Sequence, residues 1–373
     1  MENMQQGRSG GATGPAAQER NKTTMRMKKT AAFAAAALLC VSLFGCTIKS
    51  PATVGSIGGV EIPAGVYLLA QYNAYEQAAT RVEDSKKVLT SKIKDSEQTG
   101  AEYIAEETLK FIELYAAVET RFAELGGELT EEQQATVESQ TETLWTQSQK
   151  SYEKNGIGRT SLKSHVANIV KQDALLDMIY GNGGGAAVAD DELAKWVEQN
   201  YLRADYLTLP IIDFTNYVML TEDQTAKMRT LADEAAAQVN GGKSLEEIAE
   251  DTLKKASAIS GSEYSANLLA SSLGNTIFSP SQMSYYGEEA AAAMKGAKPG
   301  EATVVNIGSS LLVLVRQETV LTADYTIDSI RSSALSAMKS SELEEELRAQ
   351  GAAAEHQLDQ GAMNTYSAKK VKA

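Results

Sequence analysis

A glycine-rich run, GNGGG at residues 181–185, separates two parts of the chain that have different hydrophobic patterns. Glycine runs interrupt regular structure, so this run predicts a boundary. Before it, apolar residues recur every three or four positions, which places them on one face of a helix. The clearest case is the set Ile104, Phe111, Tyr115, Val118, Phe122 and Leu125. After the run, strand-like and helical segments are mixed. The pattern of the whole chain therefore predicts the α+β class.

Helices are predicted on both sides of the run from periodicity and from end signals. The tetrapeptide TEEQ at 130–133 and the pair Ser244 and Glu247 have the residues of capping boxes, in which two side chains pair with the first free amides of a helix. Asp190 is expected to cap a shorter helix. The residues expected to face inward just before the run are Leu162, Val166, Ile169, Leu176 and Ile179. The predicted helices span 64–80, 104–125, 130–152, 161–180, 190–199, 221–239, 244–253, 288–294 and 327–347.

Strands are predicted in the second part of the chain. Residues 201–210 are strand-like and stop at a proline, which cannot continue the hydrogen bonding of a sheet. Residues 303–307 and 311–316 flank a Gly-Ser-Ser turn and predict a hairpin. The serine-rich stretch 256–286 is predicted to be irregular, and the basic tail, 364–372, to be extended.

The N-terminal residues have the order of a bacterial lipoprotein signal. A positive segment at 25–29 precedes an apolar segment at 30–44, which is shorter than the roughly 20 residues of a membrane-spanning helix. Gly45-Cys46 follows the apolar segment, as in a lipobox, although Phe44 stands where a small residue is usual. An ordinary signal peptide or an uncleaved anchor is the alternative. We predict a lipoprotein signal peptide at 25–45 and lipidation of Cys46.

This signal predicts where the protein resides. Residues 46–53 would be a lipidated tether and residues 1–24 a disordered extension. The protein is therefore expected at the cell membrane, lipid-anchored on the extracytoplasmic face. Because Cys40 would leave with the signal and Cys46 would carry lipid, the mature chain would have no free thiol.

Charge and composition argue against several functions. The formal net charge is −14 and the isoelectric point is about 4.8, so phosphate backbones repel the chain and no nucleic-acid binding is expected. Two histidines and two cysteines give little support for zinc sites, cysteine nucleophiles or a Ser-His-Asp triad. His165 and His356 show no metal-ligand spacing. No metal and no organic cofactor are predicted.

Four local motifs resemble the PrsA/SurA type of extracytoplasmic foldase, which joins a helical chaperone domain to a parvulin-type (PpiC-type) peptidyl-prolyl isomerase domain. Residues 54–67 resemble the start of the chaperone domain, and 190–200 resemble the helix before the isomerase domain. Residues 242–249 resemble a parvulin helix, and 282–301 resemble the parvulin segment from a pocket methionine to a Pro-Gly-Glu turn.

The resemblance implies a fold and a division of the chain. It implies an α+β protein in which a mainly helical SurA-like chaperone domain, 54–200, carries an inserted parvulin-like α+β domain, 201–320. The inserted domain would consist of a small antiparallel sheet plus helices. The C-terminal helix and tail, 321–373, would return to complete the helical domain.

The resemblance also implies a site in which key residues have changed. Tyr206 stands where parvulins have their first histidine, and the place of a second histidine falls near Ser310. Met283 matches the pocket methionine, and Tyr285 or Tyr286 matches a pocket aromatic. Tyr206 and Met283 are thus the candidate catalytic residues, with Ser310 and the two tyrosines as binding residues. A pocket without the histidine pair is expected to bind but to catalyse poorly.

The main hypothesis is a membrane-anchored extracytoplasmic chaperone or foldase that binds unfolded secreted proteins. Tyr72 and Tyr75 are candidate client-binding residues, because tyrosine offers amphipathic surface to varied peptides. The expected partners are client polypeptides and the membrane, with a homodimer as a further possibility. One alternative is an active peptidyl-prolyl cis-trans isomerase with a rewired site. The other is a lipoprotein that binds a solute or a protein partner.

Overall fold

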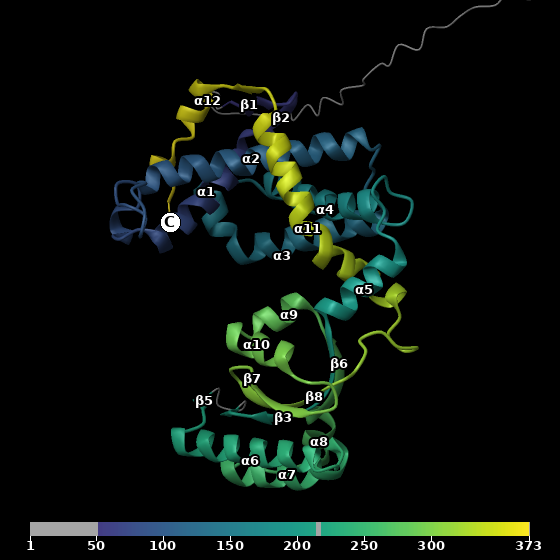
Figure 1. Cartoon of the computed structure of the whole chain (residues 1–373). Helices are drawn as coiled ribbons and strands as arrows, with labels where there is room; N and C mark the ends of the chain where they lie inside the picture. Colours follow the sequence, from purple (N-terminus) through teal and green to yellow (C-terminus); the bar gives the residue numbers. More distant parts are fainter. Residues whose placement is uncertain (1–50, 214–217, 373) are drawn as a thin grey trace, which may run out of the picture. The chain divides into compact units, whose positions relative to one another are not determined.

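The computed structural model describes residues 51–213 and 218–372 (Figure 1). Long helices make up the helical part of the chain. Helix α11 packs against α2, α4 and α5, although it follows them by more than a hundred residues, and apolar side chains of all four helices share one core. The helices are α1 (Ala64–Arg81), α2 (Gly100–Glu124), α3 (Glu131–Lys154), α4 (Arg159–Tyr180), α5 (Asp190–Asn200) and α11 (Ile327–Ala353), with a 3-10 turn at Ser85–Lys87.

A small antiparallel sheet joins the two ends of the described chain. Its strand order is β2-β1-β9, so β9 (His356–Leu358) pairs with β1 (Thr53–Ile57), which also pairs with β2 (Val60–Pro63). Helix α12 (Gln360–Thr365) and a 3-10 turn (Ala368–Lys370) follow β9. The prediction of an extended tail from residue 364 was wrong, because these two helical turns pack beside β1 and α1.

The α+β part of the chain is built on an antiparallel sheet in the order β6-β3-β8-β7. Its strands are β3 (Leu202–Pro210), β6 (Leu273–Phe278), β7 (Ala302–Asn306) and β8 (Ser310–Arg316). Together with the helical part, this sheet confirms the predicted α+β class. The predicted hairpin is the pair β7–β8, with Asn306 opposite Leu311.

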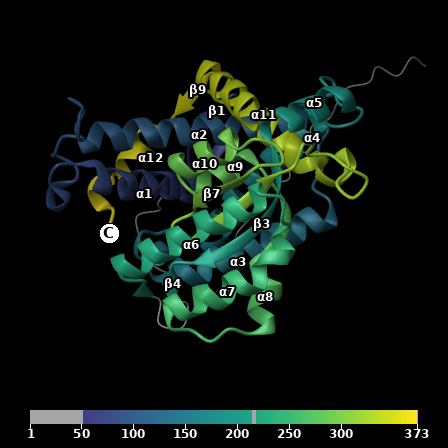
Figure 2. The same cartoon turned by 60° about the horizontal axis from the view of Figure 1, so that its bottom comes forward.

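Helices cover both faces of this sheet (Figure 1). Leu207 and Leu209 of β3 contribute to a core with α6 (Glu222–Asn240) and α7 (Leu245–Ser260). Leu202 and Ala204 alternate to the other face, where α9 (Pro280–Tyr285) and α10 (Glu288–Gly296) cover them. Figure 2 shows α6 and α7 side by side on their face. The remaining elements here are α8 (Ala266–Ser272), β4 (Ile212–Asp213) and β5 (Val218–Met219).

Several local predictions need correction. The stretch 256–286, predicted to be irregular, contains the end of α7, then α8, β6 and α9. Asp190 is the first residue of α5 rather than its cap, which is Ala189 without a side-chain hydrogen bond. Ile169, expected to face inward, is 41% exposed, and the buried neighbour is Val170.

The N-terminal predictions lie largely outside the described residues. These are the extension at 1–24, the signal peptide at 25–45, Cys46 and most of the tether. Within the tether, Thr53 already belongs to β1. Among the described residues, no helix is both long enough and apolar enough to cross a membrane. The divisions of the chain near residues 200 and 320 stay predictions.

Candidate functional site

Tyr206 lies on β3, on the sheet face that α9 and α10 cover. Its ring rests on Gly274 of β6, the residue directly opposite in the strand register. A Cβ at position 274 would lie 2.3 Å from the Tyr206 hydroxyl oxygen, so only glycine leaves room for the ring there. The next ring is that of Phe278, also on β6, with its centroid 6.0 Å from that of Tyr206. Tyr206 is therefore fixed between strands and remains partly exposed.

Met283 and Tyr286 reach the same face from α9 and its C-terminal end, and Tyr285 contacts Tyr286 at the surface. Ser279 and Gln282 form a capping box that starts α9, and Pro280 occupies its first turn. Met283 is 1% exposed and packs into the core under the rings. Helix α9 ends at Tyr285, and the chain comes to the surface there.

The aromatic residues form a row that we call the aromatic cluster: Tyr206, Phe278, Tyr286 and Tyr285. The centroid of Phe278 lies 6.5 Å from that of Tyr286, and the latter lies 5.8 Å from that of Tyr285. Both contacts are edge-to-face. Exposure increases along the row from Phe278, which is 6% exposed, to Tyr285, which is 87% exposed. The cluster thus runs from the core to solvent.

The chemistry of the aromatic cluster is that of a binding surface. Its polar atoms are tyrosine hydroxyls, which can donate and accept hydrogen bonds. The adjacent carboxylate, Asp205, points to the other face of β3 by strand alternation and accepts hydrogen bonds from Asn275 and Gln317. The two histidines of the sequence lie in other elements, His165 on α4 and His356 on β9. The surface can hold apolar side chains or a proline ring.

Ser310 is not brought to the aromatic cluster. It begins β8 and pairs with Pro210, whereas Tyr206 pairs with Leu314. Four residues of strand separate the two positions, which corresponds to about 13 Å. Ser310 is also only 3% exposed. The structure therefore places Tyr206, Met283, Tyr285 and Tyr286 together and Ser310 apart from them.

Tyr72 and Tyr75 lie on α1 in the helical part, and both are partly buried. Tyr72 packs edge-on against Tyr152 of α3, with ring centroids 6.0 Å apart. Trp145 stacks on Tyr152, with ring centroids 6.1 Å apart. Tyr75 packs against a separate small core that includes Val82 and Ile104. These tyrosines are components of the helix packing as well as of its surface.

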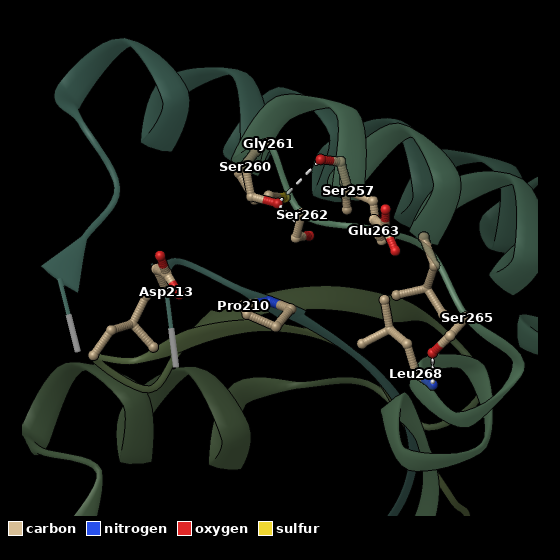
Figure 3. Close-up of a pocket in the computed structure, with 13 residues that line it drawn as sticks. Pro210, Asp213, Ser257, Ser260, Gly261, Ser262, Glu263, Ser265 and Leu268 are labelled. Atoms are coloured by element: carbon tan, nitrogen blue, oxygen red, sulfur yellow. Dashed lines mark hydrogen bonds between the residues drawn. The ribbon is translucent and has the colours of Figure 1, made fainter. Parts of the chain in front are cut away.

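A cavity of about 450 Å³ lies on the opposite side of the α+β part, between α7, α8 and the end of β3 (Figure 3). Its walls are apolar at Pro210 and Leu268 and carry hydroxyls at Ser257, Ser260 and Ser262. The Ser257 hydroxyl is buried and has no hydrogen-bond partner among the described residues. No sequence motif predicts this cavity; the serine-rich composition of residues 256–286 is the local signal, since it supplies Ser257, Ser260, Ser262 and Ser265 to the walls.

Metal binding finds no support in the described residues, where no group of three or more His, Cys, Asp and Glu side chains is close enough to hold an ion. His165 instead contacts an aromatic ring, that of Phe111, with centroids 4.9 Å apart. Burial at that position lowers the pKa of His165 to about 4. His356 lies beside Glu113, with its Nε2 atom 3.4 Å from the Glu113 Oε1 atom.

No protein-family model matches the sequence, and no curated protein matches it. Among solved structures, this chain is similar to the foldase protein PrsA from Streptococcus pneumoniae. The match covers 85% of this chain and 99% of that chain, at 13% sequence identity and a TM-score of 0.35.

Proposed function

We propose that this chain is a lipid-anchored, extracytoplasmic chaperone that binds unfolded segments of secreted proteins. In this proposal the α+β part holds such segments and does not isomerise their prolyl bonds. The observation that carries the proposal is the aromatic cluster, which presents Tyr285 and Tyr286 to solvent above the buried Met283. Tyrosine rings of this kind bind varied peptides through apolar contact with a polar edge.

The anchor and the compartment rest on the sequence. The positive segment, the apolar segment and Gly45-Cys46 occur in the order that a lipoprotein signal requires. A chaperone tethered in this way would meet secreted chains as they emerge from the membrane. Metabolic labelling with a radioactive fatty acid tests the anchor, because the label should be incorporated by the natural chain and lost in Cys46→Ser.

Client binding is tested by the suppression of aggregation of reduced insulin, followed by light scattering. The double variant Tyr285→Ser/Tyr286→Ser should need about tenfold more protein for the same suppression, since two aromatic contacts of about 0.5–1.5 kcal/mol each are lost. The matched control is Val218→Ser, which removes another exposed apolar side chain of the same part of the chain, 59% exposed on β5. Equal suppression by all three proteins would contradict the proposed role of the cluster.

Isomerase activity is tested by NMR exchange on several Xaa-Pro peptides. We expect exchange at the uncatalysed rate, because the cluster contains no charged or proton-transferring side chain beyond tyrosine hydroxyls. Exchange that is faster in the natural chain and falls in Tyr206→Phe would instead make the protein an isomerase with a rewired site.

A small-ligand-binding lipoprotein is the second candidate, and the cavity in Figure 3 favours it. An unpartnered, buried hydroxyl at Ser257 among apolar walls is the arrangement of a pocket that orients a small polar ligand. Such a function predicts saturable thermal stabilisation by one compound, reduced in Ser257→Ala. Thermal melting against a panel of small metabolites tests it.

A further inference from the structure

A cavity in the helical part lies between the start of α1, the turn that joins α3 to α4, and the C-terminal residues after α12. Its volume is about 690 Å³. Leu68 and Gln71 of α1 form one wall, Asn155 and Ser161 form a second, and Tyr366 and Val371 form a third. We call it the α1 cavity.

Gln71 gives the α1 cavity an unpartnered polar atom. The side chain is 5% exposed, and its Nε2 atom donates to the hydroxyl oxygen of Tyr67 at 3.4 Å. Its Oε1 atom is buried and has no hydrogen-bond partner among the described residues. A buried amide oxygen without a donor is unfavourable, so a ligand in the cavity that supplies an N–H group would be stabilised there.

Asn155, on one wall of this cavity, binds the peptide backbone of Lys372, which also lines the cavity. Its Nδ2 atom donates to the carbonyl oxygen of Lys372 at 2.9 Å, and the backbone N–H of Lys372 donates to its Oδ1 atom at 2.7 Å. One side-chain amide thus binds both polar groups of one residue of an extended chain. Gln71 offers a second side-chain amide on the wall of the same cavity.

The rim of the α1 cavity is basic, whereas the chain carries a formal net charge of −14. Lys369, Lys370 and Lys372 line it and are exposed. Lys370 donates through its Nζ atom to the carbonyl oxygen of Thr365 at 2.7 Å. A local group of cations on an acidic protein attracts acidic ligands and repels basic ones.

We propose that the α1 cavity binds an extended peptide segment that carries an acidic side chain. A backbone N–H of the segment donates to Gln71, an apolar side chain packs against Leu68 and Val371, and the carboxylate lies at the lysine rim. The inference rests on the proposed chaperone function and names the class of client segment. A lipid phosphate would meet the same lysines, but side-chain amides complement the amides of a peptide.

The test uses three fluorescent decapeptides and the purified full chain, with binding followed by fluorescence anisotropy. The first peptide alternates valine, serine and glutamate, the second has glutamine in place of glutamate, and the third is the first with alternate backbone nitrogens methylated. The acidic peptide should bind about tenfold more tightly than either of the others, which is the size of one charge-assisted or one buried hydrogen bond.

Two variants distinguish the contribution of the Gln71 amide to peptide binding from that of the lysines. Gln71→Leu should lower the affinity for the acidic peptide about tenfold. Its melting temperature should stay equal or rise, because an unpartnered buried oxygen is removed, so lost binding would not reflect misfolding. Lys369→Gln/Lys372→Gln should weaken the acidic peptide and leave the glutamine peptide unchanged. The matched control is Lys86→Gln/Lys87→Gln, which removes two exposed lysines that do not line the cavity.

The inference is overturned if the three peptides bind equally, or if Gln71→Leu binds the acidic peptide as tightly as the natural chain. A second result would also overturn it, namely binding to anionic lipid in place of peptide. In that case the natural chain would float with phosphatidylglycerol vesicles but not with phosphatidylcholine vesicles and would bind no peptide. The variant Lys369→Gln/Lys372→Gln would no longer float with the phosphatidylglycerol vesicles. The aggregation assay separates this result from failure of the proposed function. If suppression persists, only the site assignment is wrong, and if the natural chain suppresses nothing, the chaperone proposal is wrong too.

Discussion

The contact between Tyr206 and Gly274 leaves no room for a side chain at position 274, and adding one methyl group there tests it. In Gly274→Ala the new Cβ would lie 2.3 Å from the hydroxyl oxygen and from the ring atom that carries it. We expect a loss of about 1–3 kcal/mol in the free energy of unfolding, as for other overpacked sites. In a Tyr206→Ser background the same substitution should cost little, and a double-mutant cycle by urea denaturation measures the coupling. Equal costs in both backgrounds would mean that the ring does not lie on this glycine.

His165 predicts a dependence of stability on pH. Its pKa is lowered from 6.5 to about 4 by burial, so between these values the unfolded chain binds a proton that the folded chain does not. Stability from this group is therefore complete above pH 6.5 and falls as the pH decreases towards 4, by up to about 1.4 kcal/mol per pH unit. His165→Phe, which keeps a ring beside Phe111, should flatten the curve in this window. An unchanged slope in urea denaturation from pH 4 to 6.5 would contradict the assignment.

Two helix starts were predictable because their signals are local. Both predicted capping boxes are confirmed, with Thr130 and Gln133 at α3 and Ser244 and Glu247 at α7. Strand β6 was missed because its residues, Leu273–Phe278, include a glycine and an asparagine that disfavour strands. It forms because β3 pairs with every one of them, a contact across about 70 residues that no local pattern carries.

The capping box of α7 should contribute measurably to the stability of the α+β part. Ser244 accepts a hydrogen bond from the backbone of Glu247 at 3.2 Å, and the Glu247 carboxylate accepts one from the Ser244 backbone at 2.7 Å. Ser244→Ala should lower the free energy of unfolding by about 1 kcal/mol. Ser244→Asp restores an acceptor at the cap and should recover most of the loss. If both variants unfold at the same urea concentration as the natural chain, the cap contributes nothing.

The candidate site was predictable only where family resemblance supplied the residues. Tyr206, Met283, Tyr285 and Tyr286 were selected in this way. The first two and Tyr286 share one core on a sheet face, and Tyr285 contacts Tyr286 from the solvent side. Phe278, which joins Tyr206 to Tyr286, was missed because it belongs to the unpredicted strand β6. The α1 cavity was beyond sequence reasoning, because it needs α1, the α3–α4 turn and the C-terminal residues to meet.

The pairing of β1 with β9 joins the two ends of the described chain, and Gly55 makes it possible. Gly55 has a φ of +111°, and a Cβ there would lie 2.3 Å from the carbonyl oxygen of Gln357. Gly59 also has a positive φ, +82°, but a Cβ there would meet nothing within 4 Å. Alanine at either position would be strained by the positive φ. Only at Gly55 would the added Cβ also clash with β9.

Gly55→Ala should therefore separate β9 from β1, whereas Gly59→Ala should cost only about 1–2 kcal/mol of backbone strain. Two amides report the junction directly, because Gly58 donates to the Glu355 carbonyl and Asp359 donates to the Val54 carbonyl, each at 2.9 Å. Hydrogen exchange at both amides should accelerate far more in Gly55→Ala than in Gly59→Ala. Equal acceleration in the two variants would show that backbone strain, and not the clash with β9, opens the β1–β9 pairing. Released C-terminal residues would also open the α1 cavity, whose third wall they form.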